Sequence, residues 1–288
     1  MSAHNEVAAL LDRCTFPAAG TAAVSGGADS LAMLALAVEA GCRIVEAVHV
    51  DHGLRPGSAD EADVVRAACA ELGVPFRSER VVVERGPNLE ARARAARRAA
   101  IGTEHMTGHT ADDQAETVLL NLVRGAGTAG LGAMVSGPTK PVLRLRRAET
   151  RAVCAARRWS PVADPSNEDP AFRRNRLRHE VLPLLDRIAE RDVAVLLARS
   201  ASLAGDDDAL LCELAAAIDV TDARSLTTTP AALARRAVRS WLSQGGYPPD
   251  AATVERVLGV ARGDARACDV GRGRSVRRSG QRLVLFGP

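Results

Sequence analysis

The stretch Val24-Ser25-Gly26-Gly27-Ala28-Asp29-Ser30 constrains the fold of this chain more than any other. Apolar residues precede it (21–24) and a helix-forming run follows it (31–37), an order that predicts strand, tight turn and helix. The two glycines permit positive φ and close approach of a ligand to the backbone. Serine hydroxyls and the free N–H groups of the first helical turn favour phosphate. The pattern therefore predicts a phosphate-binding loop.

Asp29 is the unusual member of this loop. The stretch lacks the Gly-Lys-Ser/Thr ending of a Walker A loop. A carboxylate beside phosphates repels them unless a divalent cation lies between, as Mg²⁺ does with nucleotide phosphates. Asp29 is therefore the candidate metal ligand, for Mg²⁺. A capped Gly-Gly turn would explain the glycine pair alone, but the whole heptapeptide between strand and helix favours ATP.

The composition is typical of a globular protein of about two domains. Of 288 residues, 47% are hydrophobic and 25% charged. No apolar run is long enough for a bilayer, and the first residues lack the pattern of a secretory signal. The six cysteines form no Cys-x-x-Cys, which predicts reduced thiols and a cytoplasmic protein. Residues 140–199 hold 14 basic and 8 acidic side chains, a local +6 in a chain of +3.

A second apolar run, residues 43–52, predicts a buried parallel strand. Its polar end, Asp51 and His52, lies where open α/β sheets bind ligands. His49 and His52 lack the further partners of a zinc site. A loop (53–58), a helix (59–73) and a third strand (74–83) are predicted next.

An arginine-rich helix is predicted over residues 88–98. Arg94 and Arg97 are neighbours at i, i+3 and can contact one phosphate together. The other arginines of this helix do not follow one stripe, so solvated charge is the alternative interpretation for the segment.

A second polar motif runs from Gly108 to Thr117. A short strand ends at Met106-Thr107, and Thr110 or Asp112 caps a helix that continues to Val123. Asp112 and Glu116 share one helix face, and Asp113 and Thr117 share the next. Helix capping alone would account for some of these acids. A histidine followed by two aspartates at a strand end also suits a metal or a cationic amine.

Later segments supply basic residues and a small C-terminal region. A glycine-rich loop (124–132), a helix (149–158) and a rigid turn (161–167) precede a helix from 173 to 185. Arg174 and Arg178 share a face of that helix with Asn175 beside them, a pattern of an anion or nucleotide clamp or of a solvated basic face. From residue 184 the pattern is helical, with a break at 227–230, two short helices within 231–262 and a β-hairpin over 270–286.

Four stretches in this order resemble the tRNA(Ile)-lysidine synthase family, which belongs to the PP-loop ATP pyrophosphatases. They are Ser25–Ser30, Val50–Arg55, Gly108–Thr117, and Asp164–Asn167 with Arg174-Asn175-Arg176. The resemblance implies an α/β fold with a doubly wound, mostly parallel sheet of the adenine nucleotide alpha hydrolase type. It also implies a PP-loop catalytic domain over 1–185 and a small, mainly helical tRNA-binding domain with a short β tail over 186–288.

The resemblance further implies the reaction and its partners. Such a ligase adenylates the wobble cytidine (C34) of the CAU anticodon of tRNA(Ile), releases pyrophosphate, and lets the ε-amine of free L-lysine displace AMP to give lysidine. The cofactors implied are ATP and Mg²⁺, and the assembly is expected to be a homodimer without a membrane partner.

The site residues follow from the matching motifs. Catalytic roles fall to Asp29, Asp112, Asp113 and Arg174. ATP binding falls to Ser25, Gly26, Gly27, Ala28, Asp29, Ser30, Asp51, His52, Gly108 and His109. Binding of lysine or tRNA falls to Arg94, Arg97, Glu116, Asn175 and Arg178. Two departures from the family pattern are Arg98, where Tyr is usual, and a short 99–107 segment.

Three alternative functions remain. A tRNA 2-thiocytidine synthetase would need a Cys-x-x-Cys, which the chain lacks. An amidotransferase-type PP-loop synthetase would need a glutamine-hydrolysing domain or an ammonia donor. An inactive tRNA-binding relative is disfavoured by the presence of Asp29, Asp112 and Asp113.

Overall fold

The computed structural model of the chain describes residues 3–51, 61–81, 92, 96, 99–102, 104–244 and 248–287. The chain divides into two compact units, Met1–Leu203 and Ala204–Pro288. The predicted end of the first domain, residue 185, lies within unit 1. Of the predicted site residues, His52, Arg94 and Arg97 lie outside the described residues.

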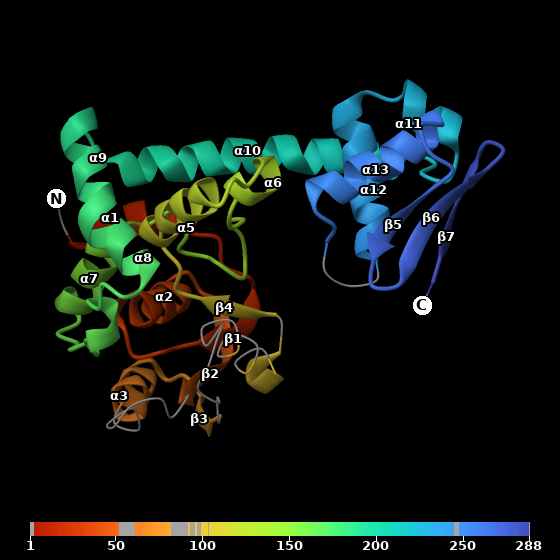
Figure 1. Cartoon of the computed structure of the whole chain (residues 1–288). Helices are drawn as coiled ribbons and strands as arrows, with labels where there is room; N and C mark the ends of the chain where they lie inside the picture. The colour runs from red at the N-terminus through yellow and green to blue at the C-terminus, as the bar shows by residue number, and fades with distance from the viewer. Residues whose placement is uncertain are drawn as a thin grey trace. The chain divides into compact units, whose positions relative to one another are not determined.

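Unit 1 contains a four-stranded parallel sheet (Figure 1). Its strands are β1 (Ala19–Ala23), β2 (Arg43–Asp51), β3 (Phe76–Arg80) and β4 (His105–Thr107), in the order β3-β2-β1-β4. All three strand pairs are parallel. The chain steps from β1 to β2 to β3 in one direction, and β4 returns to the other side of β1. The order therefore reverses at β1, and such a switch point opens a ligand crevice at the carboxyl ends of the strands. The doubly wound parallel sheet predicted from the sequence is confirmed.

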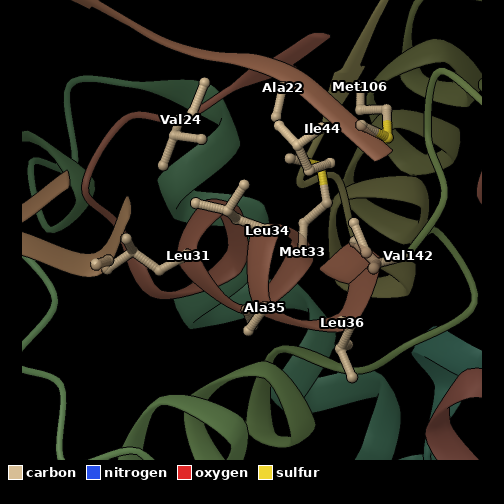
Figure 2. Close-up of a cluster of buried hydrophobic side chains, with 14 of the residues drawn as sticks. Ala22, Val24, Leu31, Met33, Leu34, Ala35, Leu36, Ile44, Met106 and Val142 are labelled. Atoms are coloured by element: carbon tan, nitrogen blue, oxygen red, sulfur yellow. The ribbon is translucent and has the colours of Figure 1, made fainter. Parts of the chain in front are cut away.

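Helix α2 (Ala28–Glu39) forms the centre of the core of unit 1. Every residue from Ser30 to Ala37 is buried, as expected for a helix that is apolar on all sides. Figure 2 shows Met33 of this helix on the side that faces Ile44 of β2 and Met106 of β4, whereas Leu36 points to the opposite side of the helix. Burial of α2 fixes the position of its N-terminus, where the phosphate-binding loop lies.

The remaining elements of unit 1 are mostly helical. They are α1 (Ala3–Leu11), α3 (Glu61–Leu72), α5 (Ala111–Val123), α6 (Thr128–Leu131), α7 (Arg147–Ala156), η2 (Pro165–Asn167), α8 (Arg173–Arg176), η3 (Leu177–Val181), α9 (Leu182–Ala189) and α10 (Val193–Ala216), whose C-terminal part lies in unit 2. Two predictions are corrected. The loop predicted over 124–132 contains the short helix α6, and α7 starts two residues before its predicted start.

In the described part of unit 2, the end of α10 and three further helices combine with a three-stranded antiparallel sheet. The helices are α11 (Ala223–Thr228), α12 (Ala231–Ser243) and α13 (Ala251–Arg262), and the strands are β5 (Ala267–Gly271), β6 (Arg274–Ser279) and β7 (Arg282–Phe286). The break predicted over 227–230 is shorter in the structure, because α11 continues through Thr228 and only residues 229–230 separate it from α12. The two helices predicted within 231–262 are confirmed. The predicted hairpin is β6–β7, but the prediction missed most of β5, whose short run ends in Gly271 and lacks clean alternation.

The structure also bears on the expectations for the cysteines and for membrane-spanning segments. All six cysteines are free thiols, as the absence of a Cys-x-x-Cys led us to expect. No helix among the described residues has both the length and the apolar character needed to cross a bilayer.

Candidate active site

The phosphate-binding loop connects the end of β1 to the start of α2. Gly26 has a φ of +80°, and a Cβ there would lie 3.1 Å from Cγ2 of Val162. The Val162 N–H donates to the Gly26 carbonyl at 2.9 Å. Glycine is thus required at this bend both by its left-handed backbone and by the close approach of the 162 segment. Gly27 follows in extended conformation as the N-cap of α2.

Ser30 holds the loop in shape from inside the first turn of α2. Its Oγ accepts a hydrogen bond from the Ser25 N–H at 3.1 Å and donates to the Gly27 carbonyl at 3.0 Å. The Ser25 hydroxyl lies 3.2 Å from the Oγ of Ser30. The loop therefore curls over the N-terminus of a buried helix, where free N–H groups and the helix dipole attract phosphate.

Gly108 brings the end of β4 against this loop. A Cβ at Gly108 would lie 2.6 Å from the Asp29 carbonyl oxygen and 2.7 Å from the Ser30 nitrogen. No side chain fits between these backbones, so glycine lets the end of β4 approach the first turn of α2. The next residue, His109, is held by a 2.8 Å hydrogen bond between its Nδ1 and the Thr107 hydroxyl.

The first turn of α5 contains two aspartates with different hydrogen-bond partners. Asp113 accepts from the Thr110 N–H at 2.9 Å and forms a capping box with it, which confirms Thr110 as the cap. Asp112 receives a bidentate pair from Arg146, at 3.0 Å from Nε and 2.9 Å from Nη2. The Arg147 N–H also donates to Asp112 at 2.7 Å.

Arg147 lies at the point where the carboxylates of the loop and of α5 converge. Its Nε donates to Asp29 at 3.3 Å, its Nη2 to Asp113 at 2.9 Å, and its Nη1 to Glu116 at 3.3 Å. The hydroxyl of buried Thr150, one turn further along α7, contacts Asp29 as well. Asp113 and Glu116, at i, i+3, thus share a partner, whereas the sequence paired Asp112 with Glu116.

Glu116 is fully buried and gathers two further arginines. Arg178 donates from Nε at 2.7 Å and from Nη2 at 3.2 Å, and Nε of Arg174 lies 3.2 Å away. Nη2 of Arg174 also donates to the Thr117 hydroxyl at 2.8 Å. Arg174 and Arg178 lie on one helix face as predicted, and both pair with the carboxylate of Glu116.

The local environment shifts the pKa values of these acids in different directions. Burial raises the pKa of Asp29, against the lowering influence of Thr150 and Arg147 and with a further rise from the Asp113 charge. Burial acts in the same direction on Asp112 and Asp113, but arginine contacts and backbone N–H groups outweigh it and lower both pKa values. Burial disfavours the charge of Arg147, yet the surrounding carboxylates raise its pKa.

Asn175 supports the site from behind. It is buried, and its Nδ2 donates to the carbonyls of Ser166 at 2.7 Å and Asp169 at 2.8 Å. Asn175 does not line the cavity of the site. The structure therefore places it as an anchor of the 166–169 turn, and the predicted contact with lysine or tRNA has no geometric support.

A cavity of about 1340 Å³ opens over the loop and the carboxylates. Ligand pockets commonly measure about 300–1,000 Å³, so this one has room for a nucleotide and part of a second substrate. The predicted residues that line it are Ser25, Gly27, Ala28, Asp29, Ser30, Asp51, Gly108, His109, Asp112, Asp113 and Arg178. Gly26, Glu116 and Arg174 are not part of its lining.

Three residues of the site were not found from the sequence: Arg146, Arg147 and Thr150. The sequence contains one signal that could have identified the two arginines. Arg146 is the N-cap and Arg147 the first residue of α7, at the helix end where the dipole disfavours cations. Two arginines at that position indicate acidic partners elsewhere in the fold.

Mg²⁺ fits the donors at Asp29 in the manner typical of nucleotide enzymes. The Asp29 carboxylate lines the cavity beside the loop hydroxyls. No group of three or more metal-ligating side chains occurs in the described part of the chain. Mg²⁺ commonly takes only one or two carboxylates and completes its shell with phosphates and water. Asp29 alone could therefore supply the protein's ligand to such an ion.

The parallel sheet, with a glycine-serine loop at its switch point and an aspartate facing the cavity, defines a PP-loop ATP-binding enzyme. Residues 4–185 match the PP-loop domain family, and residues 222–284 match the TilS substrate binding domain. The chain belongs to the tRNA(Ile)-lysidine synthase family.

Individual relatives agree with this placement. The tRNA(Ile)-lysidine synthase of Nocardia farcinica (strain IFM 10152) is 46% identical over 242 residues, which cover 78% of this chain and 75% of the relative. That of Thermobifida fusca (strain YX) is 37% identical and covers 83% and 81%. Among solved structures, a U34-tRNA thiolase from Methanococcus maripaludis has a TM-score of 0.53 at 18% identity and covers 70% of this chain and 77% of its own. This last similarity concerns the fold alone.

Proposed function

We propose that the chain ligates L-lysine to C2 of the wobble cytidine (C34) in the CAU anticodon of tRNA(Ile), at the expense of ATP. The family match supports ATP use and a tRNA substrate. The observation that carries the proposal is the convergence of Asp29, Asp113 and Glu116 beside the phosphate loop. A reaction between an adenylated base and an amine requires that the site for the nucleotide phosphates lie next to the site for the amine.

The first step activates the base. The C2 carbonyl oxygen of C34 attacks the α-phosphorus of ATP, an O–P bond forms, and the bond to the β-phosphate breaks to release pyrophosphate. The Ser25–Ser30 loop binds the phosphates at the N-terminus of α2. Asp29 would hold Mg²⁺, which when bound supplies positive charge to the phosphates. Holding the reactants together removes much of the entropic cost of their encounter.

The second step joins lysine to the base. After the bound ammonium gives up a proton to solvent, the neutral ε-amine attacks C2 and a C–N bond forms. The C–O bond breaks with its electron pair leaving on AMP, and the second proton that the nitrogen sheds also passes to solvent. Asp113, which lines the cavity and already pairs with a guanidinium, would bind the lysine ammonium, and buried Glu116 would add negative charge from behind it. Arg178, which lines the cavity, and Arg174 behind it would steady these carboxylates and the developing phosphate charge.

The discriminating experiment measures AMP release from ATP with a CAU tRNA(Ile) transcript, with and without L-lysine. We expect lysine-dependent release and a lysidine mass at C34 in the digested tRNA. An unmodified C34 under saturating ATP, Mg²⁺ and lysine would refute the proposal. A cytoplasmic location, where the free thiols stay reduced, is part of the proposal. The homodimer stays a prediction, which sedimentation would test.

A further inference from the structure

Arg147 connects the phosphate side of the cavity with the amine side. Asp29 belongs to the loop at the start of α2, whereas Asp113 and Glu116 belong to α5. Among the contacts of the described residues, Arg147 alone bridges the two groups. Its side chain is only 15% exposed, and it lines the cavity. One guanidinium thus occupies the space between two proposed substrate subsites.

The charges of the cluster around Arg147 balance before any ligand binds. Four carboxylates face four guanidinium groups: Asp29, Asp112, Asp113 and Glu116, with Arg146, Arg147, Arg174 and Arg178. A cationic amine that enters finds each carboxylate already paired. It would have to compete with an arginine and would leave that arginine without an anion in a partly buried site, which is costly.

A triphosphate changes this balance. It brings more negative charge than one Mg²⁺ neutralises, and guanidinium groups pair strongly with phosphate oxygens. Arg147 is suited to turn toward it, since Asp29 beside the loop is already one of its partners. Its place at the first turn of α7 is also disfavoured by the helix dipole. If it turns, Glu116 keeps Arg174 and Arg178, but Asp113 loses its closest guanidinium.

We infer that Arg147 is a positioning residue that occupies the amine site until nucleotide phosphates draw its guanidinium away, so that lysine binding depends on bound nucleotide. The inference rests on the proposed function, because it assumes that Asp113, with buried Glu116 behind it, receives the lysine ammonium. It orders the reaction: the nucleotide site fills first, and the amine enters afterwards.

The test is a calorimetric titration of L-lysine into the full chain in Mg²⁺ buffer, with and without saturating α,β-methylene-ATP. In the unaltered protein the analogue is expected to tighten lysine binding about tenfold or more, a coupling of ordinary size. In Arg147→Gln, lysine is expected to bind with the same affinity in both conditions, within about twofold. Arg144→Gln is the matched control, because this exposed arginine on the same segment lies outside the cavity lining and should keep the tenfold ratio.

Arg147→Lys keeps the inference testable if the glutamine variant does not fold. A single ammonium cannot reach three carboxylates as a guanidinium does, so the ratio should fall without disappearing. The inference is overturned if either variant keeps the full ratio of lysine affinities with and without the analogue, or if the unaltered protein binds lysine equally well in both conditions. Lysine binding would in either case still support the proposed function. Absence of lysine binding even with the analogue contradicts the proposed function and the inference together.

Discussion

The carboxylates of this site lie close together but hold their protons differently. Burial raises the pKa of Asp29, whereas arginines lower the pKa values of Asp112 and Asp113. On acidification Asp29 therefore takes up a proton first and loses its attraction for a cation, while the aspartates of α5 remain ionised. Nucleotide binding should fail at a higher pH than the ion pairs that hold α5 to α7.

Asp29→Asn removes the charge that would bind a cation and keeps the size of the side chain. We expect pyrophosphate release to fall by at least about 10²-fold, as when one electrostatic contact to a transition state is lost. Binding of tRNA, measured by filter retention, should stay nearly intact, because Asp29 lies in the phosphate loop. An equal loss of both would make Asp29 structural.

Gly108→Ala tests the close approach of the end of β4 to the first turn of α2. The added Cβ would lie 2.6 Å from the Asp29 carbonyl oxygen, so the N-terminus of α2 has to shift. Overpacking of this kind costs about 1–3 kcal/mol, and thermal unfolding should show it together with weaker nucleotide binding. Gly137→Ala is the control, since a Cβ there meets nothing within 4 Å and should change neither quantity. Equal behaviour of the two variants would contradict the packing argument.

Among the elements, α5 and α7 are joined chiefly through arginines at the start of α7. Arg146 pairs with Asp112 and also contacts Asp192, just before α10. The Asp112 side chain is 16% exposed, so this pair is screened only in part. These contacts set the distance between the acidic turn of α5 and the loop, and with it the geometry of the cavity.

Asp112→Asn should destabilise the protein at neutral pH. Asp112 has a pKa below its ordinary value, so its contribution is fully present above the unfolded-state pKa of about 3.9 and disappears as pH falls through the folded-state pKa. At pH 7 we expect a loss of about 1.5–3 kcal/mol in the free energy of unfolding, typical of hydrogen bonds to a charged group. Denaturant titrations of both proteins should converge as the pH approaches 3. A difference that stays constant with pH would exclude the ionised carboxylate as its source.

The elements that the sequence predicted well are those whose pattern is local. The apolar runs before Ser25 and Asp51 predicted β1 and β2, and the cap of α5 follows from neighbouring residues. The missed features depend on distant partners. Arg147 contacts Asp113 and Asp29, which are 34 and 118 positions away, so no local pattern reveals its role. Of the predicted third strand, 74–83, residues 82 and 83 lie outside the described residues, and in the described part the parallel pairing with β2 runs from Phe76 to Arg80.

In the whole molecule, the match to the TilS substrate binding domain covers 222–284 and so includes most of the small sheet of unit 2. One face of this sheet packs on the helices through Val276 and Leu283. The other face carries Phe286, which is 46% exposed, and the Arg277 guanidinium lies 5.1 Å from the centroid of its ring. An arginine stacked on an exposed aromatic ring is a common surface for RNA bases and phosphates.

Arg277→Gln should therefore weaken tRNA binding and reduce its dependence on salt. Among the described residues no carboxylate pairs with Arg277, so its charge is available to a phosphate. Loss of one such contact should lower the slope of log K against log salt concentration by about 0.7–1, measured by filter binding between 50 and 200 mM salt. Nucleotide binding should not change. Arg235→Gln is the matched control, because Arg235 of the same unit already pairs with Glu255 at 2.6 Å and has less charge to offer. If both variants shift the slope equally, general charge and not the stacked pair binds the tRNA, and the sheet face loses its role.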